Sequence, residues 1–356
     1  MASVLSHVRR VLPPAGKLPL PRGPVTERLL ASLRDRPHHL SWKLSAPEAS
    51  DEDDLHLALY CCYELHYHGF LGVDADWEWE PDLLAVRRQL EAQFLADLGV
   101  PDASIHPDIT TVIARLSEIA TDNVGPSLSA WVADRATLDQ VRELAIHRSA
   151  YQLKEADPHT WAIPRLAGQA KAAMVAIQAD EYGNGIAARM HATLFARTME
   201  ALGLDPASSY LDLIPGVTLA TTNLISLLGL HRRWRGALVG HLALFEMSSV
   251  GPMARYGTAL RRLGVPQAGW LFYDAHVDAD DIHRHVATDG MVTGLLLREP
   301  DLARDVLFGA EALDAVEARF SRFVLNRWDE GRSSLRAVPD LRAGTSSAER
   351  FDVSIS

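Results

Sequence analysis

The sequence predicts an all-α protein, and three observations carry this prediction. Apolar residues recur every three or four positions along most of the chain, as they do on the buried face of a helix. Glycines stand where such segments end, and aspartate or serine often stands where they begin. No segment alternates apolar and polar residues between hairpin turns, as the strands of an antiparallel sheet would.

The expected helices follow one another from residue 51 onward. In the first half of the chain they cover residues 51–70, 81–99, 109–120 and 137–156. Beyond Pro164 they cover residues 165–182, 186–203, 210–229, 236–264, 273–285 and 301–328. Gly99, Gly203, Gly229 and Gly264 close their segments, and we expect them to act as C-terminal caps, because helices commonly end on a left-handed glycine.

The length and composition allow one large core or two modest ones, since the chain has 356 residues with 47% hydrophobic and 23% charged side chains. Proline and glycine in residues 12–24 and polar composition after about residue 333 indicate loosely structured ends. We therefore expect an arm over residues 1–25, a helical extension packed on the core over 26–135, the helical core over 136–332 and a flexible tail over 333–356.

The net charge and the cysteines exclude several classes of protein. A formal charge of −11 gives no general attraction to nucleic acid or to an anionic membrane surface, so we expect neither as a partner. The two cysteines, Cys61 and Cys62, are neighbours that cannot easily form an unstrained disulfide, which favours a reducing compartment. The N-terminal residues lack the apolar stretch of a signal peptide, and no segment has 18 uninterrupted apolar residues. We expect a cytoplasmic protein.

The segment YDAHVDADDIHRH, residues 273–285, holds three histidines and four aspartates in thirteen positions. On a helix His276, Asp280 and His283 stand at i, i+4 and i+7, so their side chains point from one face within about two turns. A solvated acidic face would have a similar composition. The spacing alone therefore leaves a metal site and a solvated face open.

Carboxylates and an imidazole also interrupt apolar segments earlier in the chain. Glu181 and His191 lie in QADEYGNGIAARMHATLF, and Glu246 lies in LALFEM. Burying a glutamate is costly unless it is paired, protonated or bound to a metal. A salt bridge to an arginine of residues 232–235 would also satisfy Glu246, and His191 could be a hydrogen-bonded core histidine, so both interpretations stay open here.

Together these residues resemble the ligand order of the haem-oxygenase-like di-iron oxidases and oxygenases, often called iron-containing redox enzymes. The matching order is Glu181, His191, Glu246, His276, Asp280 and His283, with separations of 10, 55, 30, 4 and 3 positions. The match covers about residues 150–300. The ferritin-like type differs, because it needs two Glu-x-x-His motifs and none of the 15 histidines stands in one.

The resemblance implies a haem-oxygenase-like helical bundle, with extra N-terminal helices, in which these six side chains bind two Fe(II) ions and form the catalytic site. Nitrogen and oxygen ligands without a thiolate suit iron or manganese, so Mn is a second candidate. By the same resemblance O2 would be the co-substrate.

The implied substrate is a small organic metabolite of one of three classes: an amine, an amino acid or a carboxylic acid. The implied reaction is N-oxygenation or oxidative C–C cleavage, as in secondary metabolism, and the fold does not choose between them. An external electron donor and a homodimer stay open as partners. Two other classes stay open as well: a non-catalytic iron-binding or storage protein, and a haem-binding protein of the same fold.

The ten positions between Glu181 and His191 do not fit one straight helix. Ten residues make about 2.8 turns, which leaves the two side chains roughly 80° apart on an ideal helix. We therefore expect the sequence YGNG, residues 182–185, to bend or interrupt the helix, either by a π-bulge or by a new start near Gly183.

Other polar residues have several interpretations. Glu155 and His159 in LKEADPHTW are four positions apart with Pro158 between them, so a metal ligand, a contact to a ligand or substrate, and a structural role stay open. We expect Glu64, His66 and His68 on a surface or interface, with a metal role as the alternative. The arginines Arg232, Arg233 and Arg235 could anchor a substrate carboxylate or form a solvated cap at a helix end.

Overall fold

The computed structural model describes residues 15–42, 51–99, 106–121 and 125–337. Within these ranges the chain forms helices and no β-strand, apart from an isolated bridge between Gly16 and Phe70. The prediction of an all-α fold is therefore confirmed. None of the described helices is long and apolar enough to cross a membrane.

The helices before residue 136 are α2 (Pro24–Leu33), α3 (Glu52–Glu64), α4 (Pro81–Leu98), α5 (Ile109–Thr121) and α6 (Leu128–Arg135). The next are α7 (Leu138–Gln152), α8 (Asp157–Thr160), α9 (Gly168–Glu181), α10 (His191–Ala201), α11 (Gly216–Leu230) and α12 (Arg235–Ser248). The last are α13 (Val250–Arg262), α14 (Leu271–His285), the π-helical segment Val286–Val292, α15 (Thr293–Leu296) and α16 (Ala303–Asp329).

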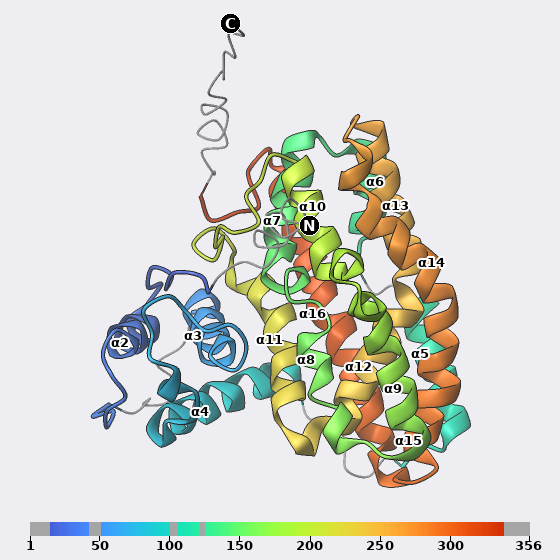
Figure 1. The fold of residues 1–356 in the computed structure, drawn as a ribbon, viewed down its shortest axis with the longest axis horizontal. Coiled ribbons are helices and arrows are strands. Elements are labelled where there is room, and N and C mark those ends of the chain that lie inside the picture. Colours follow the sequence, from blue (N-terminus) through green and yellow to red (C-terminus); the bar gives the residue numbers. More distant parts are fainter. Residues whose placement is uncertain (1–14, 43–50, 100–105, 122–124, 338–356) are drawn as a thin grey trace, which may run out of the picture.

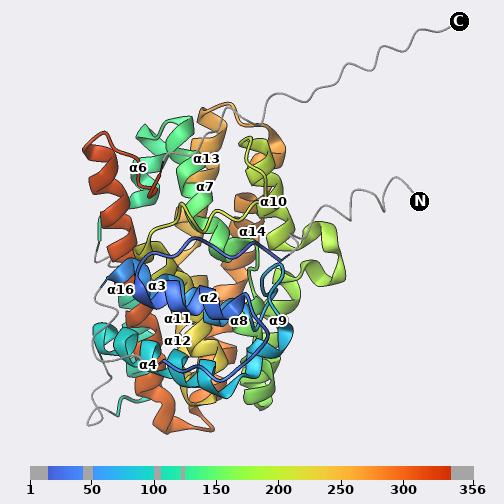
Figure 2. The same ribbon diagram turned by 90° about the vertical axis from the view of Figure 1, so that its left-hand side faces the viewer.

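In space, most helices form one bundle with α12 and α16 near its centre (Figure 1). Helix α16 packs against α5, α6, α11 and α12. Helices α2, α3 and α4 lie together on one side of the bundle, where α3 packs on α11 (Figures 1 and 2). The N-terminal helices thus cover one face of the bundle, and the division of the chain into four regions stays a prediction.

The close contact between α12 and α16 depends on two glycines. A Cβ on Gly240 would overlap the backbone carbonyl of Val306, and a Cβ on Gly309 would overlap that of Ala237. Glycine alone lets the two backbones approach this closely, because it has no Cβ. This contact fixes the position of α12, the helix that carries Glu246.

A buried carboxylate attaches the N-terminal segment to the rest of the chain. Asp54 on α3 is 1% exposed and accepts hydrogen bonds from the backbone nitrogens of Val25 and Thr26 at 2.9 and 2.8 Å. These two nitrogens belong to the first turn of α2, which lacks partners within the helix. The backbone nitrogen of Leu20 also donates to Asp212, at 2.7 Å. Residues near the start of the described chain are therefore bound to its middle.

Most of the expected helices are confirmed, but the single helix expected over residues 236–264 is wrong. It divides into α12 and α13 at Ser249. Pro252 is the physical reason, because it has no N–H to donate to the carbonyl of Ser248 and its ring crowds that carbonyl. Helices α2, α6, α8 and α15 were not expected.

The expected glycine caps are confirmed at three positions and wrong at one. Gly99, Gly203 and Gly264 follow their helices with φ values of 78°, 77° and 72°. Gly229 lies inside α11, which continues to Leu230. Glycine is needed there because a Cβ would lie 2.5 Å from the carbonyl oxygen of Pro158, so its absence lets α11 pack closely against α8.

Candidate metal centre

Five of the six sequence-predicted site residues converge inside the bundle. Glu181 is the last residue of α9, His191 is the first of α10, Glu246 lies on α12, and His276 and His283 lie on α14. All five are buried, with exposed fractions of 2–7%. Asp280, the sixth, lies on α14 between the two histidines, but its side chain lies outside the described part of the chain.

A further carboxylate, that of Glu155, joins them from the turn between α7 and α8. The ligand-type atoms form two groups, each with all its atoms within 4.8 Å of one another. The first group is Glu155, Glu181, His191 and His276; the second is Glu181, Glu246 and His283. Glu181 belongs to both groups, so the geometry offers two adjacent positions for a cation.

Glu155 is directed inward by an unusual backbone. The next residue, Ala156, has a positive φ of 77°, a conformation that costs a residue with a side chain about 1–3 kcal/mol. The surrounding structure supports it, since the carbonyl of Ala156 accepts hydrogen bonds from Gln178 Nε2 at 2.9 Å and from the backbone nitrogen of Thr160 at 3.1 Å. The spacing of Glu155 to His159 drew attention to it in the sequence but left its role open.

The chain between Glu181 and His191 confirms the predicted interruption. Helix α9 ends at Glu181, and short 3₁₀ turns over Gly183–Gly185 and Ala187–Arg189 lead to α10. Gly183 has a φ of 66°, and a Cβ there would lie 2.6 Å from the backbone nitrogen of Met190. The tight turn brings Nδ1 of His191 to 2.8 Å from Oε2 of Glu181.

The ring of His276 has a fixed orientation. Its Nδ1 lies 2.8 Å from the carbonyl oxygen of Phe272. A carbonyl only accepts hydrogen bonds, so Nδ1 carries the proton and Nε2 of the neutral ring keeps its lone pair. Nε2 lies 3.6 Å from Oε1 of Glu155, which places a donor atom suited to a metal beside that carboxylate.

His283 lies between two carboxylates. Its Nε2 is 3.2 Å from Oδ2 of Asp180, and its Nδ1 is 3.3 Å from Oε2 of Glu246. The Asp180 side chain is 38% exposed, whereas that of Glu246 is 4% exposed. Asp180 can accept the Nε2 proton and leave Nδ1 directed into the site, an arrangement common behind metal-bound histidines. The sequence analysis did not identify Asp180.

The cluster contains three buried carboxylates. Burial raises the pKa of Glu155, and the imidazole of His276 opposes that shift. Burial also acts to raise the pKa of Glu181, but the neighbouring imidazoles, His191 foremost, lower it below its usual range. Three carboxylates in a small buried volume repel one another, and cations would neutralise them.

Several buried atoms of the cluster lack a hydrogen-bond partner among the described residues. They are both carboxylate oxygens of Glu155, Oε2 of Glu181 and Nδ1 of His191. The 2.8 Å approach of the last two atoms does not have the orientation of a hydrogen bond. A buried polar atom without a partner is costly, and a bound metal would remove that cost. The residues therefore fit a metal, and donors of nitrogen and oxygen without sulfur favour iron or manganese.

The other polar residues singled out in the sequence lie outside the two groups. His159 is buried beside them and its Nε2 lies 3.1 Å from Nδ1 of His241. Glu64 and His66, expected on a surface or interface, are buried within the chain, where they contact Lys154 and Glu78. The remaining residues are more exposed: His68 lies 3.7 Å from Glu64, Arg235 pairs with Glu299, and Arg232 and Arg233 belong to a short 3₁₀ turn before α12.

Known proteins with similar sequences identify the family of the chain. Residues 142–318 match the family described as iron-containing redox enzyme, and the chain belongs to this family. Over 194 residues it is 24% identical to the nitrosourea synthase of Streptomyces achromogenes subsp. streptozoticus. That alignment covers 53% of this chain and 41% of the relative, so the chain corresponds to less than half of that protein.

Proposed function

We propose that this chain is a non-haem di-iron oxidase or oxygenase that uses O2 to oxidise a small organic metabolite. The observation that carries the proposal is the position of Glu181, which belongs to both groups of ligand-type atoms. A carboxylate has two oxygens and can bind one cation with each. Membership of the iron-containing redox enzyme family supports iron as the metal.

In this proposal the roles follow the two groups. Glu155, His191 and His276 would hold one ion, Glu246 and His283 would hold the other, and Glu181 belongs to both groups. The sequence predicts Asp280 as a further ligand, and its side chain lies outside the described residues, so it is assigned to neither ion. Two Fe(II) ions bound there would supply the electrons that activate O2. Mn(II) is the alternative metal, and an external electron donor would return the ions to the reduced state.

The protein itself would exclude bulk water from the site and hold the reacting groups in place. The proposed ligands described here are at most 7% exposed, so bulk water is kept away from the site. Tyr151 stands beside them, and burial together with the carboxylates of Glu155, Glu181 and Glu246 raises its pKa well above the usual value. The phenol of Tyr151 therefore keeps its proton at neutral pH and remains a hydrogen-bond donor.

The substrate is proposed to be an amine, an amino acid or a carboxylic acid of secondary metabolism, oxidised in the cytoplasm by N-oxygenation or C–C cleavage. A homodimer is part of the same proposal. The relative named above acts in nitrosourea synthesis, as its name says, and this supports nitrogen-containing substrates.

The test begins with anaerobic reconstitution with Fe(II) and elemental analysis. We expect about two irons per chain for the unaltered protein and for Glu200→Gln, a control on the exposed face of α10. Glu181→Gln should lose both irons while keeping its helical circular dichroism. One tightly held zinc that iron does not displace would refute the di-iron site.

The second part of the test separates the three classes of protein. O2 uptake by the iron-loaded protein is measured with a panel of amines, amino acids and carboxylic acids. Uptake that rises with one compound and yields its oxidised product supports the enzyme. Fe(II) oxidation that no compound alters would indicate an iron-storage protein, and a Soret band after addition of haem would indicate a haem protein.

A further inference from the structure

A cavity next to the proposed metal centre offers the space that the centre itself lacks. The space between the ligand side chains is only about 10 Å³, and one water molecule needs roughly 10–15 Å³. The neighbouring cavity has about 210 Å³. Tyr151 and Phe245 line both spaces. An organic metabolite cannot enter the ligand space, but it fits the cavity and would touch the two shared aromatic rings.

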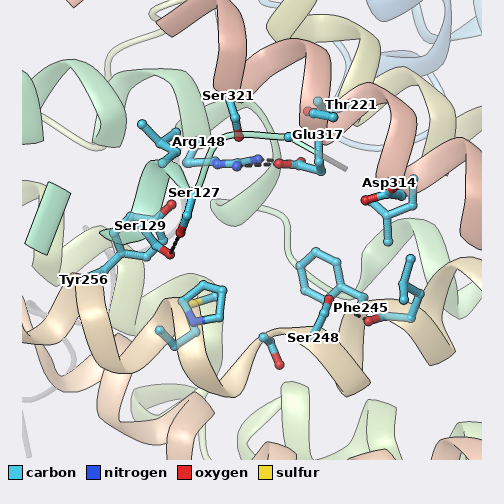
Figure 3. A pocket seen from close by; sticks show the side chains of 18 of the residues that line it. Ser127, Ser129, Arg148, Thr221, Phe245, Ser248, Tyr256, Asp314, Glu317 and Ser321 are labelled. Atoms are coloured by element: carbon cyan, nitrogen blue, oxygen red, sulfur yellow. Dashed lines mark hydrogen bonds and ion pairs between the residues drawn. The ribbon is translucent and has the colours of Figure 1, made fainter. Parts of the chain in front are cut away.

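Two charged side chains in the cavity wall, Arg148 and Glu317, neutralise each other. Arg148 on α7 donates two hydrogen bonds to Glu317 on α16, each 2.7 Å long (Figure 3). The guanidinium also lies over the ring of Phe320, 4.4 Å from its centroid. A bidentate pair of this kind satisfies both charges. Arg148 and Glu317 therefore form a fixed polar wall and leave no net charge for a ligand.

Two other charged side chains of the cavity have no ion-pair partner among the described residues. Asp314 on α16 lines the cavity without a hydrogen bond or ion pair; partial burial raises its pKa, and the charge of Arg115 opposes that shift. Arg255 on α13 donates only to the neutral hydroxyl of Ser129, at 3.3 Å. The cavity thus presents one carboxylate and one guanidinium, each able to bind an opposite charge.

The two charges lie at different ends of the cavity. Figure 3 shows Asp314 and Phe245 on one side and Ser129 with Tyr256 on the opposite side. Arg255 is held at the Ser129 end by its hydrogen bond. Phe245 also borders the ligand space, so the Asp314 end adjoins the metal centre through this ring.

The remaining lining is rich in hydroxyl groups rather than uniformly apolar. These groups belong to Ser127, Ser129, Thr221, Ser248, Ser249 and Ser321. Three of them already donate to backbone carbonyls of their own helices, Thr221 to Thr218, Ser248 to Leu244 and Ser249 to Glu246. A hydroxyl oxygen can also accept a hydrogen bond from a polar ligand, directly or through water, so the lining suits a molecule with polar groups.

We propose that this cavity binds the substrate, and that the substrate is a small zwitterion whose cationic nitrogen pairs with Asp314 and whose carboxylate pairs with Arg255. The nitrogen end then lies towards Phe245 and the metal centre. The statement that the ligand is a substrate rests on the proposed function, but binding of the ligand can be measured whether or not iron is bound.

Three probes of equal chain length test the proposal: 6-aminohexanoate carries both charges, hexylamine only the cation and hexanoate only the anion. Each is titrated calorimetrically into the isolated protein. A hydrogen bond between charged groups contributes enough to change affinity by about tenfold or more. We expect 6-aminohexanoate to bind at least about tenfold more tightly than either other probe. Equal binding of the three, or no binding of 6-aminohexanoate at millimolar concentration, would overturn the proposal.

Substitutions assign each charge to its residue. Asp314→Asn should weaken 6-aminohexanoate and hexylamine by about tenfold and spare hexanoate, and Arg255→Gln should weaken 6-aminohexanoate and hexanoate and spare hexylamine. Glu311→Gln and Arg261→Gln are matched controls, because these side chains lie on the same two helices, are 51% and 44% exposed and do not line the cavity. Unchanged probe affinity in both cavity variants would overturn the assignment.

The orientation has its own readout. In protein loaded anaerobically with Mn(II), the paramagnetic ion should relax the methylene protons next to the nitrogen of 6-aminohexanoate faster than those next to the carboxylate. The reverse order would overturn the orientation. A protein that binds the probes with this selectivity but takes up no metal would support the cavity assignment and refute the proposed function, so the two failures can be told apart.

Discussion

Replacing Glu155 by glutamine removes one negative charge from the buried cluster, and it should act in opposite directions on the metal-free and the iron-loaded protein. In the metal-free protein both oxygens of Glu155 are buried without a hydrogen-bond partner among the described residues. An unpaired buried polar group costs about 1–3 kcal/mol, and more when it is charged, so a neutral amide costs less here than the carboxylate. Neutralising it should therefore stabilise the metal-free protein.

The expected change in Tm can be estimated from the length of the chain. An unfolding entropy of about 2.1 cal/mol/K per residue gives about 0.75 kcal/mol/K for 356 residues. The relief of 1–3 kcal/mol then raises the Tm of the metal-free variant by about 1–4 °C. Iron at 100 times its Kd stabilises by about 2.7 kcal/mol per site, which corresponds to about 4 °C.

The assay is a thermal unfolding scan under anaerobic conditions with and without Fe(II), combined with elemental analysis. Because Glu155 belongs only to the first ligand group, Glu155→Gln should bind about one iron instead of two and lose about half of the iron-induced rise in Tm. Glu91→Gln is the matched control, since Glu91 is 4% exposed but contacts His231 at 2.9 Å. This control should lower the Tm of the metal-free protein and leave iron binding unchanged.

Two results would refute the reasoning. If Glu155→Gln still binds two irons with the full rise in Tm, Glu155 is not a ligand. If it lowers the Tm of the metal-free protein, the carboxylate acts as a structural partner of His276 instead.

The remaining predictions concern packing, acidity and the second ligand group. Gly240→Ala should lower the free energy of unfolding in urea by about 1–3 kcal/mol, because the new methyl group forces α12 away from α16. Gly251→Ala, whose Cβ would meet only Arg255 Nη1 at 3.8 Å, an ordinary contact, should be neutral, and equal losses would contradict the close contact of α12 with α16. Burial lowers the pKa of His147 to about 3, below the unfolded value of about 6.5, so only the unfolded chain binds the proton as the pH falls. The free energy of unfolding should therefore fall by about 2 kcal/mol between pH 7 and pH 5. His147→Gln should lack this part of the decrease, and an unchanged pH dependence of its stability would count against the reasoning. Asp180→Asn should weaken one of the two irons about 10–100-fold in a chelator competition, because Nε2 of His283 loses its carboxylate, and unaltered affinities would show that Asp180 does not orient the ring.

The periodicity of apolar residues was sufficient to predict the fold class and most of the helices, because the bundle buries one face of each helix. It failed over residues 236–264, where periodicity continued across Pro252 although the backbone could not. The interruption between Glu181 and His191 was predictable because two inward-directed side chains ten residues apart cannot share one helical face.

The site itself was only partly predictable. Spacing brought attention to Glu181, His191 and the histidines of α14, but Glu155 stayed ambiguous because its direction depends on the left-handed backbone of Ala156, and alanine gives no sign of such a conformation. The cavity depends on contacts such as Arg148 with Glu317, which are 169 positions apart. No local pattern encodes a contact of that range.

Helix α16 is the last helix of the described residues, yet it packs against α5, α6, α11 and α12 near the centre of the bundle. Ribosomes release the chain from its N-terminal end, so α12 with Glu246 emerges before its packing partner has been synthesised. Until α16 arrives, the apolar face of α12 stays exposed to water. The ligand cluster can therefore assemble in its final packing only after α16 has been synthesised. In the cell this interval is when the chain would depend most on chaperones.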